Sequence, residues 1–247
     1  MSEQAATIEV SVWDRTTRWF HWINVLCVVS LSFLALALLN GKALGLSGEG
    51  KILLKTVHVY MGYVFAANLS WRVVWGFIGG KYSRWKAVLP LGVGFIGQLK
   101  DYVAGAKSGN PPQYAGHNPM GKLMVAALFL VLFGMASTGL VLAGTDLYLP
   151  PYGGHFAAWV TGGDPSLLAH LAPGSKEYVV PTLYDEMRNF RKPFVEFHEE
   201  AFWVLLGLVA VHVGAVVVTE IRERSNLISA MFTGRKVLRG KPVDADK

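Results

Sequence analysis

The sequence predicts an all-α integral membrane protein built around a bundle of four transmembrane helices. Of its 247 residues, 52% are apolar and only 16% are charged, a composition typical of membrane proteins. Four apolar runs are long enough to cross a hydrocarbon core of ~30 Å as helices. Histidines recur inside these runs, where a polar ring is costly unless it has a partner.

The four spans are predicted at residues 19–39, 53–78, 123–143 and 194–219, within a single transmembrane domain of residues 1–247. Asp14 suits the cap position of the first helix, and Pro193 suits the first turn of the fourth. Gly41 and Gly79 follow the first and second helices, where glycine commonly ends a helix. The moderately apolar stretch 91–97 is interpreted as an interfacial segment and not as a fifth span.

The basic residues predict the orientation of these spans. Sixteen of the 23 Lys and Arg residues lie in the N-terminal segment, the loop between the second and third spans, and the C-terminal tail. The positive-inside rule therefore places both termini and this loop in the cytoplasm. The long loop of residues 144–192, between the third and fourth spans, is then outside. The basic residues lie between membrane spans, so the net charge of +6 does not require a nucleic-acid partner. The expected partner of the spans is membrane lipid.

Four of the seven histidines, His21, His58, His198 and His212, lie on predicted spans. The two on the fourth span are fourteen residues apart, so they share one helix face at a separation of about 21 Å along the axis. The predicted topology places His58 and His198 near the outer face. It places His21 and His212 near the inner face, so the four histidines form two depth-matched pairs.

Each histidine pair suits the two axial positions of a haem, because helix bundles build cofactor sites from facing side chains. With both axial positions filled, such a haem would favour outer-sphere electron transfer over oxygen chemistry. Any one of these histidines, taken alone, has the alternative of being a packed, hydrogen-bonded core residue. Zinc is the main rival metal, but it needs three or four ligands at one point.

Several stretches resemble the bacterial di-haem cytochromes b of the cytochrome b561 type, which include the b-type cytochrome subunits of nickel-iron hydrogenases. The stretches are VWDRTTRWFHW, KTVHVYMGY, SWRVVWGFIGG, HEEAFWVLLGLVAVH and LISAMFTGRK, and the resemblance spans about residues 10–238. It implies two haems b per chain, with His21 and His212 on the iron of the inner haem and His58 and His198 on the iron of the outer haem. It also implies a bacterial inner membrane and electron transfer between the quinone pool and a periplasmic redox protein, such as a hydrogenase, a dehydrogenase or a c-type cytochrome.

Three arginines are candidate partners for the haem propionates. Arg72 lies fourteen residues after His58, so it shares that helix face at the inner end. Arg15 and Arg18, at the start of the first span, are placed at the same level. The alternative for each is an interface anchor whose charged head reaches the polar headgroups.

The segment AGHNPMGKL, residues 115–123, is the candidate quinone site. It begins the third helix at the level of His21 and His212, and related di-haem cytochromes have an Asn-containing segment in a similar position. Asn118 and His117 are the side chains expected to hydrogen-bond quinone oxygens, and His117 is expected to exchange a proton with the cytoplasm. A plain helix cap explains Asn118 equally well.

The outer loop is the candidate docking surface for the periplasmic partner. Residues 145–156 and 184–194 mix aromatic and charged side chains, as interfaces do. The alternative is a lid that covers the outer haem, and His155 and His170 are expected to be surface residues. Two other functions stay open: a stand-alone quinone-linked oxidoreductase such as a superoxide oxidase, and a haem-free proton-coupled transporter.

Overall fold

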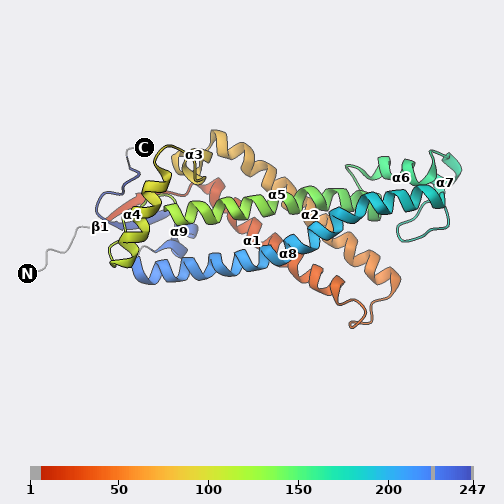
Figure 1. Cartoon of the computed structure of the whole chain (residues 1–247), viewed down its shortest axis with the longest axis horizontal. Coiled ribbons are helices and arrows are strands. Elements are labelled where there is room, and N and C mark those ends of the chain that lie inside the picture. The colour runs from red at the N-terminus through yellow and green to blue at the C-terminus, as the bar shows by residue number, and fades with distance from the viewer. Residues whose placement is uncertain (1–6, 224–225, 246–247) are drawn as a thin grey trace, which may run out of the picture. The chain divides into compact units, whose positions relative to one another are not determined.

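A computed structural model describes residues 7–223 and 226–245, and these are mostly helical (Figure 1). Among them, four helices are long and apolar enough to cross a membrane, which confirms the predicted number of spans. They are α1 (Arg15–Leu39), α2 (Gly48–Ile78), α5 (Pro119–Leu147) and α8 (Pro181–Glu223). The two chain termini, predicted to be cytoplasmic, lie outside the described residues.

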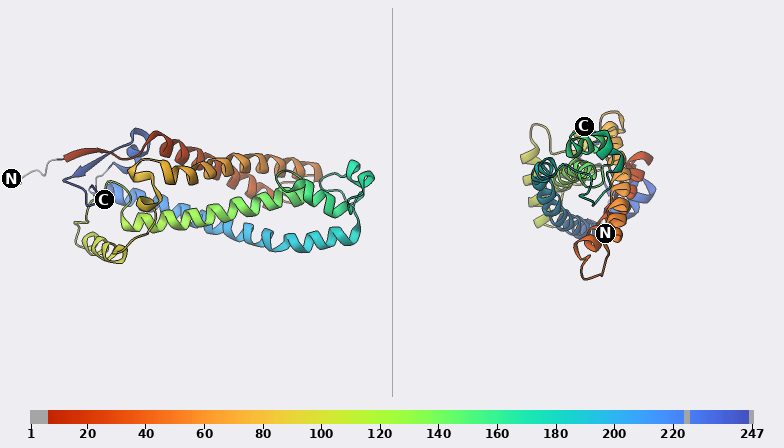
Figure 2. Two further views of the ribbon diagram at one scale, coloured as in Figure 1. Left: turned by 90° about the horizontal axis from the view of Figure 1, so that it is seen from above. Right: turned by 90° about the vertical axis from the view of Figure 1, so that its right-hand side faces the viewer.

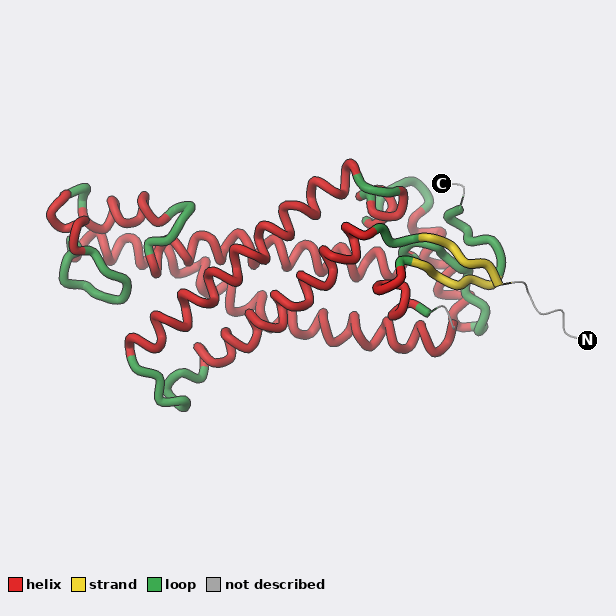
Figure 3. The backbone as a smooth tube through the Cα atoms, turned by 180° about the vertical axis from the view of Figure 1, so that it is seen from behind, coloured by secondary structure: helices red, strands yellow, loops and turns green. Residues whose placement is uncertain are grey.

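The remaining elements are short. They are β1 (Thr7–Ser11), η1 (Lys81–Ser83), α3 (Trp85–Val88), α4 (Phe95–Lys107), α6 (Gly153–Thr161), α7 (Pro165–His170), α9 (Leu227–Thr233) and β2 (Arg235–Arg239). The two strands pair antiparallel, with Thr7 opposite Arg239 and Ser11 opposite Arg235 (Figure 3). This ribbon, which joins the two ends of the described chain, was not predicted from the sequence.

Two of the predicted helix starts are confirmed by capping contacts. Asp14 precedes α1, and its carboxylate accepts a hydrogen bond from the backbone N–H of Thr17 at 2.7 Å. Asn118 precedes α5, and its side-chain oxygen accepts one from the backbone N–H of Gly121 at 2.7 Å. Both residues therefore satisfy a helix N–H that has no partner within the helix.

The predicted role of Pro193 is wrong. The helix α8 begins at Pro181, so Pro193 lies inside it and not in its first turn. The extra turns are rich in charged residues, so hydropathy does not reveal them. They are held instead by Met187, whose side chain is 1% exposed and packs against Phe156 and Val160 of α6.

The long loop predicted at residues 144–192 contains regular structure. Its first residues end α5, its last residues begin α8, and α6 and α7 lie between them (Figure 2). The backbone N–H of Val180 donates to the carbonyl of Val160 at 2.8 Å, which ties the start of α8 to α6. The segment is therefore a small packed structure with its own apolar core.

The chain divides into two compact units, each of which contains part of all four long helices. Unit 1 comprises residues 1–22, 69–130 and 205–247, and unit 2 comprises residues 23–68 and 131–204. Unit 1 has 16 basic and 8 acidic residues, whereas unit 2 has 7 basic and 9 acidic residues. Large apolar side chains on the long helices are exposed, as expected for surfaces that face lipid. Examples are Phe33, Phe77 and Leu130, which are 70% exposed or more.

Candidate functional site

His58 of α2 and His198 of α8 face each other in unit 2. Their ring centroids are 6.4 Å apart, and the ring planes make an angle of 70°. A metal between two imidazoles holds their nitrogens about 4 Å apart, and each ring centre lies roughly 1 Å further out, so centroids about 6 Å apart are expected. The observed spacing therefore fits a site in which His58 and His198 would hold one iron between them.

Thr138 of α5 determines which nitrogen of His198 is free to face the space between His198 and His58. The Thr138 hydroxyl donates its hydrogen to the carbonyl of Gly134 at 2.7 Å, and its oxygen lies 2.8 Å from Nδ1 of His198. Because the hydroxyl has one hydrogen, it accepts from His198, so Nδ1 bears the proton and Nε2 has a free lone pair. A ligand histidine needs this tautomer. Thr138 could not be predicted as a site residue, since nothing in the sequence links it to a histidine sixty residues away.

Two glycines of α5 let α8 approach closely at this point. A Cβ atom on Gly134 would lie 2.9 Å from the ring of Phe197, and one on Gly139 would lie 3.4 Å from Cε1 of His198. Small residues serve this purpose in packed membrane helices. The glycines therefore bring the Thr138 hydroxyl within reach of His198. The Nδ1 atom of His58 is buried and has no hydrogen-bond partner.

The second predicted histidine pair, His21 of α1 and His212 of α8, lies in unit 1. The two side chains are close enough to interact electrostatically. The Nδ1 atom of His21 is buried without a partner, and the Trp22 ring meets the His21 ring edge-on, with centroids 5.1 Å apart. Trp22 in turn donates to the carbonyl of Met231 in α9 at 3.0 Å, so α9 packs beside this pair. Among the described residues, no three His, Cys, Asp or Glu side chains converge as a metal cluster would require.

Arg72 of α2 is buried in unit 1, with 3% of its surface exposed. One terminal nitrogen donates to the carbonyl of Ser83 at 2.9 Å, whereas the other is buried without a hydrogen-bond partner. Its guanidinium group lies over the rings of Trp85, Phe129 and Phe20, at 4.7, 5.5 and 5.8 Å from their centroids. A buried cation with an unused donor suits an anionic partner.

The other two predicted propionate arginines differ in their surroundings. Arg18 donates to the carbonyl of Phe232 through one terminal nitrogen, while its Nε is buried without a partner. Arg15 is exposed on the first turn of α1. Arg18 therefore keeps a buried donor, as Arg72 does, and Arg15 does not.

Asp14 joins the start of α1 to the end of α2 and to η1. It accepts hydrogen bonds from the Ser83 hydroxyl at 2.6 Å and from Nε1 of Trp75 at 3.1 Å, besides capping Thr17. Burial raises the pKa of Asp14, but these hydrogen bonds outweigh it and hold the pKa below its ordinary value of 3.8. Since Arg72 also binds Ser83, this cluster fixes the position of the buried guanidinium group.

His117 and Asn118 lie just before α5, also in unit 1. The His117 ring is 4.9 Å from the ring of Trp13, and its Nδ1 atom is buried without a partner. Burial, followed by the positive charges of Lys236, Arg72 and Lys122, lowers the pKa of His117 to about 3, so the ring is neutral at physiological pH. The side-chain nitrogen of Asn118 donates to the Tyr102 hydroxyl of α4 at 2.7 Å.

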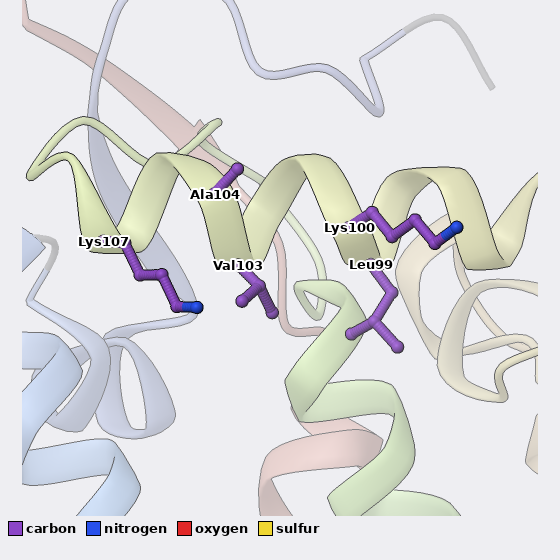
Figure 4. A pocket seen from close by; sticks show the side chains of 5 residues that line it. All are labelled: Leu99, Lys100, Val103, Ala104 and Lys107. Atoms are coloured by element: carbon purple, nitrogen blue, oxygen red, sulfur yellow. The ribbon is translucent and has the colours of Figure 1, made fainter.

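A hollow of about 340 Å³ lies along α4, lined by Leu99, Lys100, Val103, Ala104 and Lys107 (Figure 4). The first turns of α5 lie beneath α4 in this view. None of the predicted site residues lines the hollow. The contribution of α4 to the candidate quinone site is the buried Tyr102, which anchors Asn118.

Comparison with known proteins identifies the family. Residues 12–234 match the family described as prokaryotic cytochrome b561. The chain belongs to the prokaryotic cytochrome b561 family. Membership in a cytochrome b family implies a transmembrane electron-transfer protein with haem b. It also confirms the family resemblance predicted from the sequence.

Several curated proteins to which the chain is similar are named as probable Ni/Fe-hydrogenase b-type cytochrome subunits. The relative from Escherichia coli K12 is 28% identical, over 90% of this chain and 88% of its own length. The relative from Rhizobium leguminosarum bv. viciae is 24% identical, over 94% and 90%. The relative from Azotobacter vinelandii is 25% identical, over 93% and 89%. No solved structure matches the chain significantly.

The buried groups of this cytochrome b561 family member also suit the binding of haem b. The structure offers facing rings at His58 and His198, a neutral tautomer of His198 with Nε2 free, and buried nitrogens without hydrogen-bond partners at His21, His58, Arg18 and Arg72. The segments predicted to dock a partner, in contrast, are partly buried. Phe156 and Phe190 of these segments pack together with centroids 5.8 Å apart, and Asp146 forms ion pairs of 2.7 Å with Lys55 and Arg191.

Proposed function

We propose that the protein is a di-haem cytochrome b that transfers electrons between a hydrogenase at the outer face of a bacterial inner membrane and quinone at the inner face. The observation that contributes most is the 6.4 Å spacing of the His58 and His198 rings in a chain of the cytochrome b561 family. The hydrogenase partner follows from the names of the relatives. The haem-free transporter is disfavoured by membership in a cytochrome family.

His58 and His198 would hold the outer haem. A bound haem b would supply one-electron chemistry by alternating between ferric and ferrous iron. The chain contributes orientation: Thr138 holds the proton on Nδ1 of His198, so Nε2 is the atom available to iron. With both axial positions taken by histidine, no substrate would reach the iron, which is the arrangement that suits electron transfer.

His21 and His212 would hold the inner haem. The buried donors of Arg72 and Arg18 would bind its propionates, and the aromatic rings around Arg72 exclude water from that contact. Arg15, which is exposed, would at most reach a propionate at the surface of the protein. The link from Asp14 through Ser83 would keep Arg72 in place when the haem changes charge.

Quinone would bind beside His117 and Asn118. The neutral His117 ring has a buried nitrogen without a partner, which suits a quinone oxygen. The Asn118 oxygen caps α5, and its nitrogen binds Tyr102 through one hydrogen, so one N–H remains for a ligand. His117 would act chiefly as a hydrogen-bond group, because its lowered pKa makes it a weak base until a negatively charged ligand arrives.

The outer partner would dock on unit 2, and unit 1 would face the cytoplasm. The excess of basic over acidic residues in unit 1 supports this orientation, since cytoplasmic loops are enriched in Lys and Arg. On the segments predicted to dock, the side chain of Tyr152 is 46% exposed and that of Phe190 is 42% exposed. These two, and not the buried Phe156, would contact a partner.

The test of this function is haem stoichiometry in single-histidine variants. Purified wild-type protein should contain about two haems b per chain, and alanine at His58, His198, His21 or His212 should reduce this to about one. The His58→Ala and His198→Ala variants should lose the same spectral component, and His21→Ala and His212→Ala the other. The exposed His155 and His170 provide matched controls, since their alanine variants should keep both haems. Loss of one component in both His58→Ala and His212→Ala would contradict the pairing.

A further inference from the structure

The C-terminal strand and tail bind the backbone of the segment that leads to His117. Lys236 lies on β2 but is only 6% exposed, and its amine donates to the carbonyl of Tyr114 at 2.7 Å. The carbonyls of Ala115 and Gly116 are each 3.5 Å from the same amine. A buried lysine is costly unless its charge is compensated, and here three backbone dipoles surround it.

Asp244 binds the backbone N–H groups of two of these three residues. One carboxylate oxygen accepts from the backbone N–H of Ala115 at 2.8 Å, and the other accepts from that of Gly116 at 2.9 Å. Hydrogen bonds to ionised groups are shorter and stronger than those between neutral groups. The segment is therefore held through its carbonyls by a cation and through its N–H groups by an anion, and both come from the C-terminal end of the chain.

Three further contacts restrict the conformation of residues 113–116. The backbone N–H of Val243 donates to the carbonyl of Gln113 at 3.0 Å, and that of Arg239 donates to the Gln113 side chain at 2.5 Å. A Cβ atom on Gly116 would lie 3.1 Å from the Tyr82 ring and 3.2 Å from Asp244, so the contact is tight. Ala115 itself is fully buried.

We propose that Lys236 and Asp244 form a clamp by which the C-terminal segment positions His117 and Asn118 for quinone. This inference rests on the proposed quinone site. His117 directly follows the clamped residues, and its ring packs on Trp13, whose backbone N–H donates to the carbonyl of Gly234 next to β2. The clamp thus fixes the backbone before His117, while the ribbon positions the ring against which it packs. Lys236 and Asp244 are positioning residues that do not themselves touch the ligand.

The test compares Lys236→Met and Asp244→Asn with the wild-type full chain in its haem-loaded form. Both changes remove a charge at nearly constant size, and asparagine would turn an N–H group toward one of the backbone N–H groups that the carboxylate accepts. Hydrogen–deuterium exchange of residues 113–118 should become about tenfold faster in each variant. The KM for a soluble quinone analogue should rise about tenfold, while kcat and both haem spectra stay unchanged. Arg235→Met, an exposed neighbour on the same strand, should change neither quantity.

A second variant tests the clamp if Lys236→Met does not fold. A chain that ends after Gly240 keeps β2 but lacks Asp244 and Val243, and it should show the same fast exchange and raised KM. Unchanged exchange at residues 113–118 in Asp244→Asn and in this shortened chain would overturn the clamp. Faster exchange with unchanged KM would show that the clamp does not position the quinone site. If His117→Ala and Asn118→Ala react normally with the quinone analogue, the proposed quinone site fails, although the exchange result for the clamp stands.

Discussion

Thr138 is the single residue whose contacts most constrain the chemistry of the candidate outer haem. Its hydroxyl accepts a hydrogen bond from Nδ1–H of His198, which would make that imidazole a better electron donor to a bound iron. In Thr138→Val this acceptor is lost, so the ferric state should be less stable and the midpoint potential of the outer haem should rise. A hydrogen bond of about 1 kcal/mol corresponds to roughly 40 mV for one electron.

Redox titration of the purified cytochrome measures this effect. Thr138→Ser is the matched control, because serine keeps the hydroxyl and should keep the wild-type potential. The inner haem should be unaffected in both variants. A potential of the outer haem that did not move in Thr138→Val would mean that the hydroxyl does not act on the iron ligand.

Asp14 is the residue at which pH should act on stability. Its pKa is lowered in the folded protein, so its contribution is fully present above the ordinary value of 3.8 and is lost as the pH falls through the lower folded value. We expect Asp14→Ala to reduce the free energy of unfolding by about 1–2 kcal/mol at neutral pH, since a helix cap is removed. Thermal denaturation in detergent, followed by the haem absorbance, should show this difference shrinking below about pH 3.8. A difference that persisted at low pH would exclude the carboxylate as its source.

At the scale of elements, the packed segment formed by α6, α7 and the start of α8 changes how docking must be tested. Deleting residues 157–180 would remove Val160, which is completely buried, so loss of activity would not distinguish docking from unfolding. Substituting Tyr152 and Phe190 with alanine avoids this, because both residues are over 40% exposed. We expect the rate of haem reduction by the reduced hydrogenase to fall about tenfold with haem content unchanged.

Stopped-flow measurement of haem reduction provides this rate. Leu44→Ala is the control, since Leu44 is a 59% exposed apolar residue of unit 2 in the turn between α1 and α2, away from the predicted docking segments. If the double variant were reduced as fast as the control, the segment would be a lid and not a docking surface.

The sequence predicted the elements that follow from hydropathy or from capping residues. It did not predict the features that depend on contacts between residues far apart in the chain. Hydropathy sufficed for the four spans, and capping chemistry placed the starts of α1 and α5 correctly. It did not place the start of α8, whose first turns are polar and are held by the burial of Met187. The β1–β2 ribbon and the contact of Thr138 with His198 depend on residues far apart in the chain, so no local pattern indicates them.

At the scale of the whole molecule, the uneven charge of the two units predicts the membrane orientation. In a Cys27→Ala background, Ala43→Cys and Ala169→Cys would place thiols on exposed positions of unit 2, and Ser108→Cys on an exposed position of unit 1. A membrane-impermeant maleimide should label the first two in intact spheroplasts. It should label the third only after the membrane is permeabilised. Labelling of Ser108→Cys in intact spheroplasts would reverse the orientation.

The helix α8 supplies one histidine to each pair, with His198 opposite α2 and His212 near His21 of α1. It is also the last of the four long helices to leave the ribosome. If these histidines are the axial ligands, a nascent chain that has inserted only its first three helices cannot provide both histidine ligands for either iron. Haem would then be acquired after synthesis, and it would enter a bundle whose other helices already lie in the membrane. A cell short of haem would accumulate complete apoprotein, and a chain interrupted anywhere before α8 would be colourless.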